Sequence, residues 1–187
     1  MREHCRWWPI WSLLLIIIGA SSASATIVHS FSLSALSLAS HSIIRGEVVA
    51  EECVYDPHWE GIYTHTTLRV VEVLSGSEKP GDFIIVRQIG GSLDGIESQV
   101  VGTTTFLPGA EVLIFGRSDG AFHYLVGMGQ GAWNVERKTG QLPQLRRDLG
   151  KLTAVPPAGP AQPQAPDALT LPALREAVTR ALQGVQR

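Results

Sequence analysis

The sequence predicts a mainly β domain: a small, closed or partly open antiparallel barrel of five to six strands, with a short helix before it and an amphipathic helix after it. Segments rich in β-branched residues alternate with Gly, Pro and Asp turns at the spacing of hairpins. Gly46, Gly90 and Gly127 fall inside or beside these segments, where the strands of a small barrel must bend sharply to close. A flat two-sheet sandwich is the alternative architecture.

The first 25 residues have the layout of a secretory signal peptide. Arg2 and Arg6 precede an apolar run, residues 10–18, and Ala23 to Ala25 supply the small side chains that a signal peptidase accepts. We place the cut after Ala25, and the apolar run is short for a membrane span. The mature protein is therefore expected to be secreted or periplasmic, without a stable span. An uncleaved anchor is the alternative.

Removal of this leader leaves Cys53 as the only cysteine. A single thiol cannot form an internal disulfide, so the core alone must hold the domain together. Because Cys53 lies among predicted strand residues, we expect it to be buried and unreactive, with a reactive thiol as the alternative.

Charge is unevenly distributed along the mature chain. From Thr26 to Arg137, six Lys and Arg stand against thirteen Asp and Glu, a net charge of −7, whereas residues 138–187 carry a net charge of +4. An acidic body argues against nucleic acid and anionic lipid as partners. The basic tail can fold back onto the body by charge attraction, in which case salt would loosen it.

A short helix is predicted first, over residues 31–39. Leu33 and Leu36 lie on one helical stripe, and Ser32 or Ser34 can cap the first turn. Serine also recurs at every second position here, which leaves a strand as the alternative.

The longest predicted strand covers residues 62–74, and the rest of the domain is organised around it. It is rich in β-branched residues and alternates between a more and a less apolar face. A strand over residues 42–51 precedes it, with a bulge at Gly46. Residues 51–61 between the two are predicted to be a loop, because they contain Asp56-Pro57.

The remaining predicted strands are shorter. Residues 92–107 have a looser pattern, with a tight turn at Asp94-Gly95 and short edge strands at 99–101 and 103–106. The other strands are predicted over residues 82–89, 111–116, 122–126 and 132–136.

The C-terminal quarter is predicted to be a linker followed by a helix. Residues 138–169 are rich in proline and are expected to form an extended linker without a core. Residues 170–185 predict an amphipathic helix, with Thr170 as its cap and Pro172 in its first turn. A helix this short needs a surface to pack on. Its own barrel and a partner protein are the two alternatives.

Five segments carry a resemblance to known proteins: SIIRGEVVAE, IYTHTTLRVVEVLSG, GDFIIVRQIGG, PGAEVLIFG and YLVGMGQGAWNV. They resemble uncharacterised exported bacterial proteins whose body is similar to the OB-type barrel of netrin-like and tissue-inhibitor-of-metalloproteinase-like domains. The resemblance spans about Ser42 to Val135 and implies an OB-like fold that binds a protein or a ligand. Its motifs are core and turn patterns without chemistry. The N-terminal cysteine with which such inhibitors chelate a protease zinc has no counterpart at Thr26, the predicted mature start.

No motif of the sequence predicts a catalytic residue, a cofactor or a metal site. The stretch Gly90–Asp94 (GGSLD) lacks the last glycine of a nucleophile elbow, and Gly127–Gly131 leads into a strand rather than a phosphate-binding helix. The one alternative for a divalent cation is a set of four side chains with oxygen and imidazole ligands. These are Asp56, His58, Glu60 and His65.

The sequence therefore predicts an exported, non-enzymatic binding module whose partner is a secreted or envelope protein. Its contact surface is expected on the loops 51–61 and 92–101, because OB-type barrels bind through loops and one strand face. The predicted surface residues are Asp56, His58, Trp59, Glu60 and Asp94. One alternative is a small exported hydrolase that uses the acidic and histidine residues of this set. A structural envelope or matrix protein is the other.

Overall fold

The computed structural model describes residues 27–147, 149, 153–155 and 163–184, and these are mainly β with two α-helices. The mainly β prediction is confirmed. The predicted signal peptide and residues 156–162 of the proline-rich segment lie outside the described residues. Within the described part of the chain, no helix is both long and apolar enough to cross a membrane.

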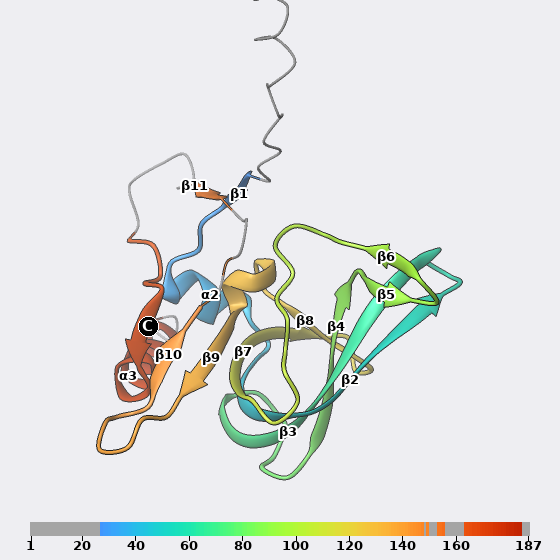
Figure 1. Ribbon diagram of the computed structural model, residues 1–187. Helices are drawn as coiled ribbons and strands as arrows, with labels where there is room; N and C mark the ends of the chain where they lie inside the picture. Colours follow the sequence, from blue (N-terminus) through green and yellow to red (C-terminus); the bar gives the residue numbers. More distant parts are fainter. Residues whose placement is uncertain (1–26, 148, 150–152, 156–162, 185–187) are drawn as a thin grey trace, which may run out of the picture.

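Eight strands form the main sheet, in the order β12-β10-β9-β7-β2-β3-β4-β8 (Figure 1). Neighbours pair antiparallel except β4 and β8, which share the single parallel pair Val86↔His123. Strand β8 also pairs with β7, so both ends of the run β7-β2-β3-β4 reach the same short strand. The strands are β2 (Ser42–Asp56), β3 (Gly61–Ser75), β4 (Phe83–Ile89), β7 (Glu111–Ser118), β8 (His123–Leu125), β9 (Ala132–Glu136), β10 (Gln144–Arg146) and β12 (Ala168–Thr170).

The prediction of five to six strands was too low, because the predicted linker supplies two more. Strand β10 lies within residues 138–169, and β12 ends at Thr170, just beyond them. Strand β10 pairs with β12 on one side and with β9 on the other. Leu145 of β10 is fully buried. This stretch is therefore more than a linker. A strand of three residues is too short to show the alternation on which a strand prediction depends.

The β2–β3 hairpin is longer than predicted. Pairing runs from Ile43↔Ser75 to Asp56↔Gly61, so residues 51–56 belong to β2, and the predicted loop over 51–61 is only a turn over 57–60. Cross-strand pairs such as Cys53↔Thr64 continue the ladder here. The sequence did not indicate a strand because these residues have the mixed polarity of a loop. The predicted bulge is confirmed, since the register shifts between Arg45 and Gly46.

Smaller elements complete the fold. Helix α2 (Leu33–Ala39) confirms the first predicted helix, and the Ser32 hydroxyl accepts a hydrogen bond from the Ala35 amide at 3.1 Å. The predicted edge strands at 99–101 and 103–106 are not strands; pairing occurs instead on the two sides of Asp94-Gly95. The remaining elements are β1 (Ile27–His29), β5 (Gly91–Leu93), β6 (Ile96–Ser98), the 3-10 helix η1 (Met128–Gly131), β11 (Thr153–Val155) and α3 (Leu171–Gln183).

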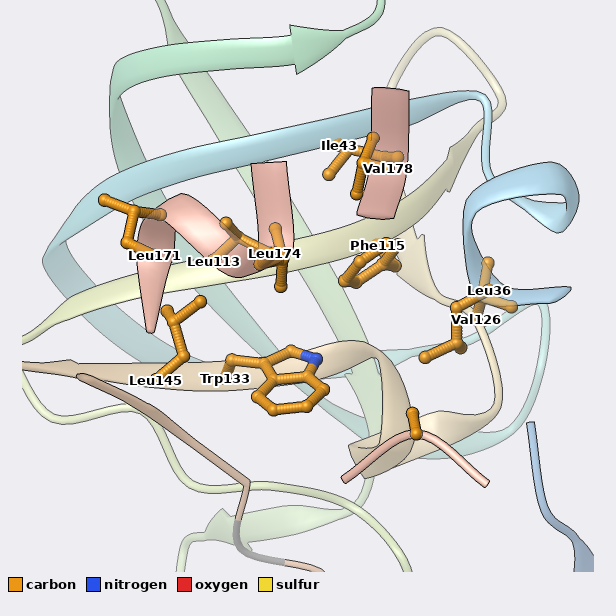
Figure 2. Close-up of a cluster of buried hydrophobic side chains, with 11 residues drawn as sticks. Leu36, Ile43, Leu113, Phe115, Val126, Trp133, Leu145, Leu171, Leu174 and Val178 are labelled. Carbon is orange, nitrogen blue, oxygen red and sulfur yellow. The ribbon is translucent and has the colours of Figure 1, made fainter. Parts of the chain in front are cut away.

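Two hydrophobic clusters pack on opposite faces of the central strands. Ile43 belongs to one cluster and Ile44 to the other, because successive residues of a strand point to opposite faces. Figure 2 shows the first cluster, which joins the sheet to α2 and α3 through Trp133, Leu145, Leu36, Leu171, Leu174 and Val178. The second is built from β2, β3, β4 and β7 with Phe106 and Ala132.

Helix α3 packs on its own domain. Leu171, Leu174 and Val178 are buried in the first cluster, and Arg175 Nη2 donates to Glu72 Oε2 of β3 at 2.8 Å. Of the two alternatives for this helix, docking on its own domain is the one observed. Because the contact is mainly apolar burial, salt should affect it less than a purely electrostatic contact.

An ion-pair network ties the central strands to this helix. Arg45 of β2 donates from Nε to Glu72 Oε2 at 2.7 Å and also pairs with Glu111 of β7. Arg137 Nε pairs with Glu111 Oε2 at 2.7 Å. Burial by itself would raise the pKa of Glu111, but the hydrogen bonds and charges of Arg137 and Arg45 outweigh it and lower that pKa from 4.5.

Substitution of Leu174 by Ala should lower the free energy of unfolding by about 2–5 kcal/mol, because it removes a fully buried side chain between α3 and the sheet. Urea unfolding measures the change. The matched control is Glu176→Ala in the same helix, whose exposed pair with Arg180 should change stability by no more than about 0.5 kcal/mol. Equal effects of the two substitutions would contradict the observed docking.

The Glu111 contacts should stabilise the protein at neutral pH and lose their effect in acid. A folded pKa below the unfolded one gives stability that is complete above the unfolded pKa and disappears as the pH falls through the folded pKa. Glu111→Gln should therefore be less stable than wild type at neutral pH, and the gap should narrow below about pH 4.5. Urea unfolding across this pH range measures the gap. The control is Glu97→Gln, at an exposed position on β6. A gap that stays constant with pH would show that the charge of Glu111 does not stabilise the fold.

Candidate functional site

The predicted surface residues lie on two neighbouring hairpin turns. His58, Trp59 and Glu60 form the turn that closes β2 and β3, and Asp94 lies in the turn between β5 and β6. In Figure 1 the β5–β6 hairpin lies beside the end of the β2–β3 hairpin, far from α3. A groove of about 400 Å³, here called the tip groove, runs between the turns. It is lined by Tyr55, Glu60, Gly61, Ile62, Leu93, Asp94, Ile96 and Ser98.

The structure brings Glu60 and Asp94 to this one groove. Both residues have left-handed backbone conformations, with φ of 49° and 50°, which side-chain-bearing residues adopt in tight turns at some cost in strain. Their apolar neighbours Tyr55 and Ile96 are 56% and 65% exposed. The tip groove therefore combines two carboxylates with an exposed apolar surface. Such a surface can receive a cationic group that lies next to an apolar one.

Trp59 is the most prominent side chain of the turn. It is 65% exposed, and its ring meets the His58 ring edge-on with centroids 4.9 Å apart. Tyr55, at the end of β2, is also exposed. Large aromatic side chains on a rigid surface are the typical anchors of protein interfaces, because they bury much area for little loss of side-chain entropy.

Asp56 holds the turn together and does not line the tip groove. Its Oδ1 accepts hydrogen bonds from the backbone amides of His58, at 2.8 Å, and Trp59, at 3.3 Å. Its Oδ2 accepts a hydrogen bond from Arg87 of β4. The Arg87 guanidinium and the two turn amides lower the pKa of Asp56, although burial acts in the opposite direction.

Arg87 is a residue that sequence reasoning missed. Only 8% of it is exposed, because the Tyr63 and Phe122 rings lie 3.9 Å and 5.0 Å from its guanidinium carbon. An arginine in an alternating strand normally points to water, so the only available sequence signal indicated the surface. A second cavity of about 220 Å³ adjoins it, here called the Arg87 pocket. Its lining includes Tyr63, Arg87, Ile89, Tyr124, Leu125 and Met128.

Cys53 is half-buried rather than buried. Its sulfur lies 3.6 Å from the Thr64 hydroxyl, in a polar pocket of about 300 Å³ that also includes Glu51. A Cβ on Gly91 would come within 2.6 Å of this sulfur, so β5 crosses here at a position that requires glycine.

The side chains considered for a divalent cation do not come together. Asp56 pairs with Arg87, Glu60 lines the tip groove, and the His65 ring packs 4.9 Å from Phe122. Among the described residues, no group of three or more His, Cys, Asp or Glu side chains is arranged to hold a metal ion. The serine of the Gly90–Asp94 stretch lies in β5, which leads into a hairpin and not into a helix.

Comparison with protein-family models and with characterised proteins finds no match for this chain. The geometry of the site therefore carries the functional assignment.

Asp56→Ala should loosen the turn that presents Trp59, because it removes the acceptor of both turn amides. Amide hydrogen exchange should become faster at His58 and Trp59. The matched control is Asp56→Asn, which loses the ion pair with Arg87 as Asp56→Ala does but keeps an acceptor for the turn amides, so exchange should rise less than in Asp56→Ala. Unchanged exchange in Asp56→Ala would show that other contacts order the turn.

Proposed function

We propose that this protein is an exported binding module that captures a secreted or envelope protein through the tip groove. The observation that carries the proposal is the exposure of Trp59 and Tyr55 beside a groove on a turn that Asp56 keeps ordered. An exposed aromatic pair beside a concave surface is the usual composition of an interface hot spot.

The partner presents a Lys or Arg side chain next to an apolar one. Glu60 and Asp94 line the groove and attract the cation, and Tyr55, Ile62 and Ile96 accept the apolar group. The net charge of −7 over Thr26–Arg137 steers a basic partner toward the domain at long range. The contact is therefore expected to form faster at low salt than at high salt.

The fold and the location belong to the same proposal. We regard the strands β7, β2, β3, β4 and β8 as a small OB-like barrel of the kind found in netrin-like domains. The pairing of β8 with both β7 and β4 supports this view. Loops at the ends of the strands are a usual binding site of such barrels, and the tip groove lies at the end of the β2–β3 hairpin. The leader over residues 1–25 supports a secreted or periplasmic location.

The hydrolase alternative has less support. It requires acid–base groups in one cleft, whereas Asp56 and His58 are not among the residues that line the tip groove with Glu60 and Asp94. The matrix-protein alternative differs in its partner, which would be a second copy of this chain.

Trp59→Ala should reduce capture of the partner at least tenfold, because loss of a hot-spot side chain costs about 2 kcal/mol or more. Tagged mature protein is incubated with the secreted and periplasmic fraction of its own cells, and the captured proteins are quantified by mass spectrometry. The control is Leu107→Ala, which removes an equally exposed side chain outside both the β2–β3 turn and the tip groove.

Equal capture by Trp59→Ala and wild type would reject the turn that carries Trp59, beside the tip groove, as part of the binding surface. If the tagged protein captures only further copies of itself, and light scattering shows a mass that grows with concentration, the matrix-protein alternative would be favoured instead.

A further inference from the structure

The outer edge of β2 has no strand beside it over the second half of the strand. Strand β7 pairs with β2 only as far as Glu47↔Glu111. Two further hydrogen bonds join Val48 to the turn before β7, and Pro108 in that turn has no N–H with which to continue the ladder. Among the described residues, β3 is therefore the only strand that pairs with Val49–Asp56. The side of this segment that faces away from β3 is here called the free edge.

The pairing of β3 with β4 determines which residues of β2 face the free edge. In an antiparallel ladder, successive residues direct their backbone groups alternately to the strands on either side. The Ile62 carbonyl of β3 accepts a hydrogen bond from the Gly90 amide at 2.8 Å, and the Val70 amide donates to the Asp82 carbonyl at 2.8 Å. Even-numbered residues of β3 therefore face β4, and odd-numbered residues face β2, because the register between β3 and β4 is continuous.

Glu51, Cys53 and Tyr55 direct their backbone groups to the free edge. Their neighbours Glu52 and Val54 pair with odd-numbered residues of β3 and so face that strand. In the described part of the chain, no backbone hydrogen bond reaches the three outward residues from the free side. They therefore offer three N–H donors and three C=O acceptors in a row, which is the surface that an added strand requires.

Two acidic side chains of the free edge have no cation beside them. Glu51 and Glu52 are both exposed, and they point to opposite faces because they are adjacent in a strand. Neither forms an ion pair with another described residue, and Glu51 accepts only a hydrogen bond from the Thr66 hydroxyl at 3.4 Å. An added strand meets one carboxylate on each face. Lys or Arg at two adjacent positions of that strand would therefore stabilise the pairing.

A pocket on one face lies next to the position opposite Glu51. The polar pocket of about 300 Å³ beside Cys53 is lined by Glu51 and Glu97 and by no Lys, Arg or His. Glu97 is exposed and has no ion pair among the described residues either. The residue of an added strand directly opposite Glu51 points to the same face as Glu51. The pocket therefore favours a long cationic side chain at that position.

Charge also decides between a different chain and a second copy of this one. If two copies paired along this edge, the second copy would add its own Glu51 and Glu52 carboxylates to those of the first. Like charges on adjacent strands destabilise the pair, and charged side chains on exposed edges oppose self-association. The same carboxylates stabilise a basic segment.

We propose that the free edge of β2 binds an extended basic segment of another protein as an added antiparallel strand. The backbone groups of Glu51, Cys53 and Tyr55 bond to this segment, and its two adjacent cations lie opposite Glu51 and Glu52. The antiparallel direction is the one in which β3 and β7 pair with β2. The surface shares only Tyr55 with the tip groove, and it goes beyond the proposed capture through Trp59.

The probe is the peptide Ile-Val-Thr-Lys-Lys-Val-Thr, blocked at both ends and titrated into the purified mature protein. Aligned antiparallel from Tyr55 to Val49, its two lysines lie opposite Glu52 and Glu51. We expect a Kd of about 1 mM, because a short peptide loses conformational entropy when it is ordered. Amide hydrogen exchange measured by NMR should slow about fivefold or more at Glu51, Cys53 and Tyr55 at saturation. Exchange at Glu52 and Val54, which already bond to β3, should change little.

Two control peptides separate charge from backbone pairing. The peptide with Glu-Glu in place of Lys-Lys should bind at least about tenfold more weakly, because both cross-strand charge pairs become repulsive. The peptide with N-methyl groups on the first Thr and the second Lys keeps its charge but cannot donate hydrogen bonds to β2 from these positions. It should also bind at least about tenfold more weakly.

A charge-reversed variant tests the edge from the other side. Glu51→Lys combined with Glu52→Lys should bind the Glu-Glu peptide and lose the Lys-Lys peptide; both side chains are exposed, so the fold should persist. The matched control is Glu136→Lys combined with Glu176→Lys, which changes the net charge equally at exposed positions of β9 and α3. It should bind the Lys-Lys peptide like wild type, as should Trp59→Ala.

Unchanged exchange at Glu51, Cys53 and Tyr55 up to about 10 mM peptide would overturn the proposal, since that is tenfold above the expected Kd. Equal affinity for either control peptide would overturn it as well. Slow exchange at these three amides without peptide that becomes faster on dilution would identify a second copy as the occupant instead. These readouts use the isolated protein, so they stand whether or not a partner is captured through Trp59.

Discussion

The whole structure depends on strands that are buried on both faces. In β2 and β7, successive residues enter different hydrophobic clusters: Val112 and Ile114 face one, and Leu113 and Phe115 face the other. One cluster joins the sheet to α2 and α3, and the second packs on the opposite face of the central strands. Because one backbone serves both clusters, the C-terminal helix and the central strands stabilise each other.

The candidate sites lie where this double burial ends. From Val49 onward β2 is more exposed and pairs with β3 alone, while β3 also pairs with β4 as far as Tyr63. Only the tip of the hairpin, from Tyr55 to Ile62, lies beyond this three-stranded part, so its turn needs local contacts to stay ordered. Asp56 provides them, and it also connects the turn to Arg87. The Asp56–Arg87 ion pair thus connects the turn beside the tip groove to a residue that lines the Arg87 pocket.

Sequence reasoning predicted the elements whose patterns are long, and it missed those that depend on distant contacts. The alternation over residues 62–74, the capped helix at Ser32 and the stripe of α3 were all visible, as were Trp59, Glu60 and Asp94. Strands β10 and β12 are too short to show a period. Tyr55 and Ile96 became part of the site only through tertiary structure. The burial of Arg87 depends on Phe122, which is 35 residues away in the chain.

The length of β2 also determines where the sequence of this domain can change without loss of the fold. One residue inserted within Ile43–Val48 would exchange the side chains of the two clusters, since each would turn to the opposite face. Beyond Asp56, an extra residue lengthens only a turn in solvent. A library of protein variants could therefore randomise residues 57–59 while the fold persists, provided that the left-handed positions Glu60, Asp94 and Gly95 are kept. The same scaffold could then be directed to new targets.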